Sequence, residues 1–346
     1  MPTAKTECTE LSVGFGLLGV DPKTISAEQA ATLFSNSLSA TKLSNYLVEY
    51  ENQPRLYAQF IDIGRRLRSD YPLFRNLSAL TWTGPQQQAA TTSASRDLLA
   101  ANVPISVKNE SNVVLNPSPY NIFITIPSGS MPASHAENWY AKTDPQGIQE
   151  LYAFVQNRSH LALPPTVDEF ERTIARDDRD ALQDFIKTLK GEAKTEFTRR
   201  YRQMCLNVSS ASAKLFNSNF EAALASNIRS SVLENIIKQF YRVNAVPYIL
   251  VGLDKHHPFA LRIPDITEWK QKWKIAALTA SPDLTRGQSV VDICMTIEER
   301  PSKNRQLMRF HVEIRWSHGK FCGNPEGKLY KKFPWSTVPF FENLFS

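Results

Sequence analysis

A short stretch of the chain predicts a β-hairpin that carries four chemically useful side chains: Asp97, Ser106, Lys108 and Glu110. Asp97 precedes an apolar run, and Asn102-Val103-Pro104 is typical of a turn, because Asn tolerates turn geometry and Pro cannot donate to a ladder. From Ile105 to Glu110 apolar and polar residues alternate, with the period of a strand. The alternation puts the serine, lysine and glutamate on one face, and a neighbouring strand would hold the aspartate beside them.

A carboxylate and an amine that meet on a sheet suit phosphodiester hydrolysis with a hard metal ion. Mg²⁺ prefers oxygen ligands and takes one or two carboxylates together with water and substrate phosphate. A lysine beside it can orient or deprotonate a water and neutralise charge that develops on phosphorus. We therefore expect Mg²⁺ as the cofactor, since a bound metal lowers the pKa of its water and clamps the scissile phosphate.

Asp97, an interval of eight residues and then Ser106-Val107-Lys108 resemble the PD-(D/E)xK nuclease superfamily, with Ser where the acid of (D/E)xK usually stands. SxK variants are similar to those of some type II restriction endonucleases, in which the missing acid comes from elsewhere. The resemblance implies that Asp97 binds the metal together with the Val107 carbonyl and a second acid. It also implies that Lys108 activates the attacking water and that Ser106 acts as a ligand through water.

Two sources of the second acid stay open. Glu110 lies two residues after Lys108 on the same strand face. Glu49 or Glu51 lies on a predicted preceding helix, and in the family such a helical layer packs against the central sheet and sometimes supplies an acid. An ordinary hairpin with a solvated polar face fits the same pattern.

The elements that would position the hairpin alternate between helices and strands. Residues 1–25 predict a loosely ordered arm, and apolar residues at helical spacing predict helices over 26–38, 41–51, 55–69, 147–155, 166–189, 192–205 and 227–243. Strands are predicted over 78–83, 120–127, 246–253, 259–263, 289–297 and 307–316. We expect an α/β (α+β) fold, with a mixed central β-sheet flanked by helices in a restriction-endonuclease-like core and a β-rich C-terminal part. The expected divisions are a core over 1–160, a helical region over 161–244 and a basic, DNA-contacting part over 245–346.

The C-terminal segment EIRWSHGKFCGNPEGKLYKKF is basic and glycine-rich, and is similar to a segment near the C-terminus of some restriction endonucleases. That resemblance implies DNA contacts, because Arg can bind guanine in bidentate fashion while Lys mostly holds phosphates. A solvated basic tail is the alternative. The candidate DNA-binding residues are Arg315, Ser317, His318, Lys320, Asn324 and Lys328.

The composition of the chain is compatible with a nucleic-acid-binding protein but does not by itself identify the functional class. The net charge of +6 and pI near 9.0 fit a nucleic-acid partner but fit many other proteins too. The four Cys are scattered without a CxxC pair, which favours thiols in a reducing compartment over a zinc site. Because no apolar run reaches membrane-spanning length and the N-terminus lacks a basic region, we expect a cytoplasmic protein without a membrane segment or signal peptide.

The sequence thus predicts a site-specific endonuclease, similar to type II restriction enzymes, that cuts double-stranded DNA and acts as a homodimer. The alternative is a non-enzymatic, sequence-specific DNA-binding protein in which the hairpin is scaffold. Replacing Lys108 would abolish cutting in the first case and change little in the second. An HNH-type site with His311 or His318 and Asn324 is a third possibility, although its spacing matches no ββα-metal motif.

Overall fold

The computed structural model describes residues 4–84, 96–131 and 137–345. Its first sheet is mixed, with strand order β1-β2-β3-β5-β6-β11, and β3 and β5 form the parallel pair between otherwise antiparallel neighbours. Its strands are β1 (Leu80–Trp82), β2 (Leu98–Ala100), β3 (Val103–Asn109), β5 (Tyr248–Asp254), β6 (His257–Ile263) and β11 (Glu342–Asn343).

The predicted hairpin is confirmed as β2 and β3, which pair antiparallel from Leu98–Ile105 to Ala100–Val103. Its turn residues Ala101 and Asn102 both have positive φ, 47° and 63°. Two left-handed residues match the twist of a tight hairpin. The strand therefore starts at Val103, slightly earlier than the sequence pattern suggested.

Four helices and a 3₁₀ turn pack around this sheet: α1 (Ala4–Leu18), α2 (Ala27–Leu33), α3 (Ala40–Asn52), α4 (Pro54–Asp70) and η1 (Pro72–Phe74). The expectation of a loose arm over residues 1–25 is wrong, because α1 is a helix that is buried from Cys8 onward. Its glycines, which suggested a loop, allow close helix packing. A Cβ on Gly16 would lie 2.0 Å from the Ile61 carbonyl oxygen of α4, and a Cβ on Gly64 would lie 2.3 Å from that of Val13.

The second sheet is antiparallel, with strand order β4-β10-β9-β8-β7. Its strands are β4 (Val113–Leu115), β7 (Trp273–Pro282), β8 (Ser289–Glu299), β9 (Arg305–Arg315) and β10 (Glu326–Lys331). The predicted apolar face of β9 is confirmed, since Met308, Phe310, Val312 and Ile314 are buried. That face belongs to a core that also contains buried residues of the helices α9 (Gly191–Ala225) and α10 (Arg229–Tyr241).

The remaining helices are α5 (Trp139–Thr143), α6 (Pro145–Gln156), α7 (Val167–Thr173), α8 (Arg176–Thr188) and α11 (Ile266–Lys272), with the turn η3 (Trp335–Thr337). Two expectations are wrong here. Residues 120–127 form a π-helical turn, η2 (Asn121–Thr125), instead of a strand. The helix expected over 166–189 is broken, with Ile174 extended between α7 and α8. None of the described helices is long and apolar enough to cross a membrane.

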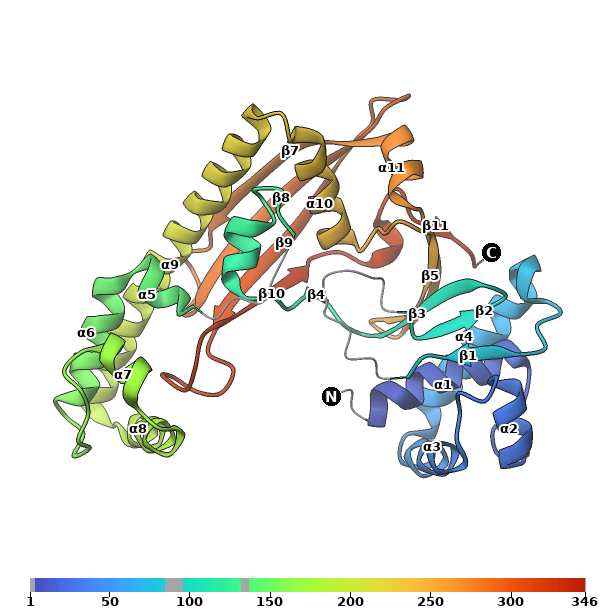
Figure 1. The fold of residues 1–346 in the computed structure, drawn as a ribbon, viewed down its shortest axis with the longest axis horizontal. Helices are drawn as coiled ribbons and strands as arrows, with labels where there is room; N and C mark the ends of the chain where they lie inside the picture. Colours follow the sequence, from blue (N-terminus) through green and yellow to red (C-terminus); the bar gives the residue numbers. More distant parts are fainter. Residues whose placement is uncertain (1–3, 85–95, 132–136, 346) are drawn as a thin grey trace.

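Figure 1 shows the two sheets joined in an arch, with α1–α4 at one foot, α5–α8 at the other and the second sheet between them. The chain leaves the first sheet after β3 and returns as β5, then leaves after β6 and returns as β11. The mixed α/β class is confirmed. The divisions at 160 and 244 stay predictions, and the first sheet takes strands from both the first and the third of these parts.

Candidate active site

The hairpin brings Asp97, Ser106 and Lys108 together as the sequence predicted. One carboxylate oxygen of Asp97, Oδ2, accepts a hydrogen bond from the Val107 amide at 2.6 Å and one from the Ser106 hydroxyl at 3.2 Å. The Asp97 amide in turn donates to the Ile105 carbonyl at 2.8 Å. Asp97 thus continues the β2–β3 ladder with its side chain just before β2 begins.

The electrostatics of Asp97 combine one unfavourable and several favourable effects. Burial raises the pKa of its carboxyl above the ordinary value, while the charge of Lys108 and the bonds from Val107 and Ser106 oppose that rise. Lys108 therefore lies within electrostatic reach of Asp97. The serine hydroxyl orients the aspartate.

An acid of α1, Glu10, is influenced by the charges of both members of this pair. Glu10 is only 7% exposed, and its Oε2 accepts a hydrogen bond from the indole N–H of Trp82 on β1 at 2.8 Å. Burial, followed by the negative charge of Asp97, raises the pKa of Glu10 to about 8, against the opposing effects of Trp82 and Lys108. Glu10, Asp97 and Lys108 form what we call the acid–lysine cluster.

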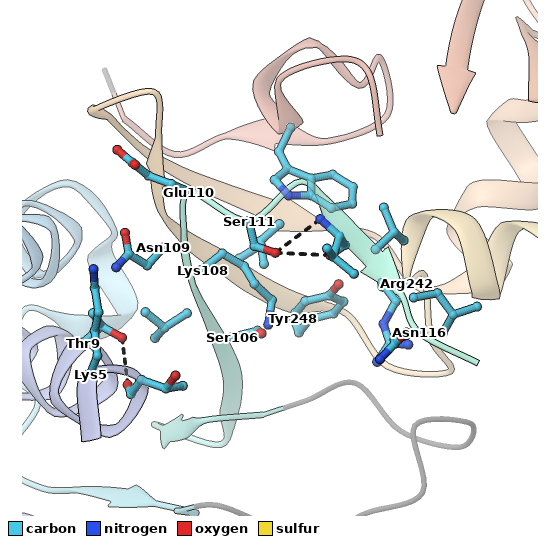
Figure 2. Close-up of a pocket in the computed structure, with 17 residues that line it drawn as sticks. Lys5, Thr9, Ser106, Lys108, Asn109, Glu110, Ser111, Asn116, Arg242 and Tyr248 are labelled. Atoms are coloured by element: carbon cyan, nitrogen blue, oxygen red, sulfur yellow. Dashed lines mark hydrogen bonds between the residues drawn. The ribbon is translucent and has the colours of Figure 1, made fainter. Parts of the chain in front are cut away.

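The sequence predicted the second acid to be Glu110, Glu49 or Glu51, and the structure gives Glu110 a partner in His256 of the β5–β6 turn. Glu110 follows β3 with a φ of 51°, and its Oε1 accepts from the His256 amide at 3.1 Å and lies 2.7 Å from His256 Nδ1. Figure 2 shows its carboxylate pointing away from the Lys108 side chain. The left-handed residue turns this side chain toward the β5–β6 turn.

Glu49 approaches α1 from a different side. It accepts a hydrogen bond from the Tyr57 hydroxyl at 2.6 Å and contributes to the electrostatics of Cys8. Cys8 and Glu10 are two residues apart on one helix, so their side chains point in nearly opposite directions. Glu49 therefore lies on the far side of α1 from Asp97.

A cavity of about 500 Å³ adjoins the cluster on the Ser106 and Lys108 face of β3. Figure 2 shows three basic side chains across it, with Lys5 of α1 on one side, Lys108 in the middle and Arg242 at the end of α10 on the other. Tyr248 and Trp335 also line it. Glu110 is the one acid among the described lining residues, so the cavity is basic.

The six candidate DNA-binding residues lie elsewhere, and none is among the described lining residues. His318 and Asn324 are exposed, whereas Ser317 donates to Glu326. Lys320 packs 4.7 Å above the Tyr201 ring of α9, and burial lowers the pKa of its amine. Arg315 lies 3.7 Å from Glu313, and Lys328 lies 3.9 Å from Glu326. Several side chains of the basic C-terminal segment thus already contact other residues of the same chain.

Histidine chemistry finds little support. The His311 ring stacks on Tyr330 with centroids 4.8 Å apart, and burial lowers the pKa of the imidazole. Within residues 4–84, 96–131 and 137–345, no three or more His, Cys, Asp or Glu side chains are grouped closely enough to hold a metal ion by themselves.

No family model, curated protein sequence or solved structure matches this chain. The site must therefore be interpreted from its own geometry.

The sequence interpretation missed Glu10, Lys5 and Arg242. The sequence did contain a pattern that indicates the helix carrying Glu10. Cys8, Leu11, Phe15 and Leu18 follow helical spacing, and all four are buried in α1. No local pattern indicates Arg242, because residues far apart in the sequence bring the end of α10 and β3 to the same cavity.

Proposed function

We propose that the protein is a Mg²⁺-dependent endonuclease that cuts DNA. The observation that carries the proposal is the acid–lysine cluster: the charges of Glu10, Asp97 and Lys108 act on one another, and Lys108 with Ser106 and Val107, which bind Asp97, lines a basic cavity. This combination matches the needs of phosphodiester hydrolysis, which are a cation site, a group to handle the attacking water and a positive environment for phosphate.

The donor set fits a hard divalent cation. Glu10 and Asp97 both have raised pKa values because their burial disfavours charge, and the charge of Asp97 further raises the pKa of Glu10. A bound cation would relieve both effects. The Val107 N–H points to Asp97, and the carbonyl of the same strand residue points to the same edge, which adds a third oxygen. Two carboxylates with water and substrate phosphate are a usual Mg²⁺ set.

Each residue of the chain has a defined task in this proposal. Glu10 and Asp97 hold the cation, which when bound supplies a more acidic water and neutralises phosphate charge. Lys108 orients the water or takes its proton, and its charge stabilises the phosphorane-like transition state. Ser106 and the Val107 amide fix the Asp97 carboxylate. The resemblance had implied a different task for Ser106, that of a metal ligand through water.

The second candidate function is DNA binding without cleavage. It is favoured by the burial of Glu10, which raises the pKa of this carboxyl to about 8, because such a carboxyl is mostly neutral at pH 7 and can be a structural group. In that case the cavity binds phosphate and the carboxyl pair merely packs α1 against the sheet.

Incubation with mixed plasmid and phage DNA tests the proposal. We expect discrete bands with Mg²⁺, no cleavage with excess chelator, and no cleavage by Asp97→Asn. Binding of the same DNA without cutting under any divalent metal would favour the second function. A smear would retain the nuclease but remove the site specificity. Sedimentation of the active protein with a palindromic DNA would test the expected homodimer.

A further inference from the structure

The cavity beside the cluster contains more positive charge than one scissile phosphate requires. Lys5, Lys108 and Arg242 come from three separate elements and lie in a row in Figure 2. A ligand with a single phosphate would use one or two of them. A DNA strand presents phosphates at regular intervals, so a row of cations matches its repeating charge.

Arg242 is held in an unusual conformation for this position. It follows α10 with a φ of 59°, and its carbonyl accepts a hydrogen bond from the Asn244 side chain at 2.8 Å. A left-handed conformation is unfavourable for a non-glycine residue and persists where its surroundings fix it. The result is a guanidinium that lines the cavity beside Asn116, with its charge felt by Tyr248.

Tyr248 connects Arg242 with the acid–lysine cluster. This tyrosine is 4% exposed, and both the positive charge of Arg242 and the negative charge of Asp97 act on its hydroxyl. Tyr248, Arg242 and Lys108 line the same cavity, so the Arg242 end and the Lys108 end belong to one site.

The cavity also contains a donor that lacks an acceptor. Trp335 lines it, is 5% exposed, and its indole N–H bonds to no acceptor in the described part of the chain. A buried donor in this state costs about 1–3 kcal/mol. An oxygen-rich ligand that reached this side chain would remove that cost.

From these features we infer that the cavity is a track for successive phosphates of one DNA strand. Arg242 and Lys5 hold the phosphates on either side of the one at Lys108. The inference rests on the proposed function for the identity of the strand, but the track itself needs neither a metal nor cleavage. The inference assigns the main contacts with the DNA sugar-phosphate backbone to α1, β3 and the end of α10, instead of to the segment around His318.

Binding without catalysis tests the track. Fluorescein-labelled duplex and single-stranded oligonucleotides are titrated in EDTA at several salt concentrations, with anisotropy as the readout. Each lost phosphate contact should make the slope of log K against log salt shallower by about 0.9 for duplex DNA and about 0.7 for a single strand. We expect this for Arg242→Gln and for Lys5→Gln, and twice the change for the double variant.

The matched control is Arg176→Gln, which removes the same charge from a 92% exposed side chain on α8 at the other foot of the arch. Its slope should equal that of the wild type, and Arg242→Lys should restore most of the slope. Thermal unfolding of each variant identifies misfolded protein. Unchanged slopes in folded Arg242→Gln and Lys5→Gln would overturn the track.

The track and the nuclease can fail separately. Shallower slopes without Mg²⁺-dependent cutting would retain the track and reject the enzyme. Cutting with unchanged slopes would retain the enzyme and reject the track. A wild type that binds neither oligonucleotide would reject the track, and the cleavage assay with Mg²⁺ would decide the enzyme by itself.

Discussion

The Val107 amide donates to the Asp97 carboxylate at 2.6 Å, so a side chain that precedes one strand is fixed by the backbone of the next. Asp97 therefore has the position of a ladder acceptor and cannot rotate without breaking the hairpin edge. Its closeness to Lys108 follows from this bond, since Lys108 is the next residue along β3. The predictions below start from that fixed geometry.

Lys108→Met should reduce Mg²⁺-dependent cleavage by about 10²–10⁴-fold, because a positioned proton-transfer group typically contributes this much. Single-turnover rates at saturating protein give the chemical step. The control is Lys303→Met in the exposed turn between β8 and β9, which should cut like the wild type. Wild-type cleavage by Lys108→Met would remove the lysine from the mechanism and favour the non-enzymatic function.

Glu10→Gln should raise the Mg²⁺ concentration needed for half-maximal cleavage by tenfold or more. The reason is that even supporting residues of metal sites change affinity by about 10–100-fold. Glu49→Gln and Glu110→Gln are the matched controls, because their carboxylates are engaged with Tyr57 and His256 instead. Calorimetric titration with Mg²⁺ in the absence of DNA gives an independent measure. A larger effect at Glu49 or Glu110 than at Glu10 would contradict the assignment of the second acid.

The stability of the metal-free protein should fall as pH rises from about 4.5 to about 8. Unfolded chains release the Glu10 proton near the ordinary pKa of 4.5, whereas the folded protein keeps it up to about 8. The native state then binds more protons in this window, so the free energy of unfolding falls by at most about 1.4 kcal/mol per pH unit. Burial raises the pKa of Asp97 as well, which adds a change of the same sign.

Urea unfolding at pH 5, 6.5 and 8 in EDTA would measure this effect. Glu10→Gln cannot titrate and should show a shallower decline, while Glu49→Gln should follow the wild type. Added Mg²⁺ should restore part of the lost stability at pH 8, because a ligand of the native state stabilises it. Equal pH dependence in wild type and Glu10→Gln would show that Glu10 is ionised in the folded protein.

Gly252→Ala should damage both stability and cleavage. Gly252 pairs with Lys108 across β3 and β5, and a Cβ there would lie 1.8 Å from the Lys108 carbonyl oxygen. Overpacking of this kind costs about 1–3 kcal/mol and would displace the lysine backbone. Gly287→Ala is the control, because nothing described lies within 4 Å of its Cβ position. Urea unfolding should show a lower stability for Gly252→Ala than for Gly287→Ala, and the cleavage rate of Gly252→Ala should also be lower. Near-identical values for the two variants would refute the close contact.

Lys331→Met should destabilise the junction of the two sheets by about 3–5 kcal/mol, since it leaves the Asp254 carboxylate without its buried cation. The Lys331 ammonium donates to Asp254 at 3.2 Å, to Asn112 at 3.2 Å and to the Phe333 carbonyl at 2.9 Å. The neighbouring Lys332→Met provides a control. Its partner is Asp292, and both side chains are about a third exposed, so under 1 kcal/mol should be lost. Chemical denaturation that gave equal losses would contradict the buried role of Lys331.

Local patterns in the sequence were sufficient for the hairpin and for β9. The alternation of apolar and polar residue types over 105–109 and over 308–315 follows the two-residue period of a strand, which requires no knowledge of the partner strand. In β9 the burial follows this alternation, whereas in β3 Ser106 is buried together with Ile105 and Val107. The same reasoning failed at residues 120–127. There Ile122, Phe123 and Ile126 are buried, a helical spacing that the alternating isoleucines obscured.

Glu10, which we propose as the second acid, could not be found from such patterns. Glu10 reaches Asp97 because α1 packs between α4 and the sheet, and that packing depends on glycines whose effect is purely tertiary. Glu110 seemed better placed in a regular strand, but its left-handed backbone rotates it away. A period-two argument assumes that the extended geometry continues to Glu110, but β3 ends at Asn109 and the next residue is left-handed.

The second sheet is assembled from two separate chain excursions: β4 belongs to the first, and β7–β10 belong to the second. The helix α9 of the first excursion packs on β7 and β8 of the second. During synthesis on the ribosome, the apolar face of α9 therefore stays exposed to solvent until the last quarter of the chain, which contains β7–β10, has emerged. Premature termination anywhere in β7–β10 would leave that surface open to chaperones and proteases, so truncated products should be cleared quickly in the cell.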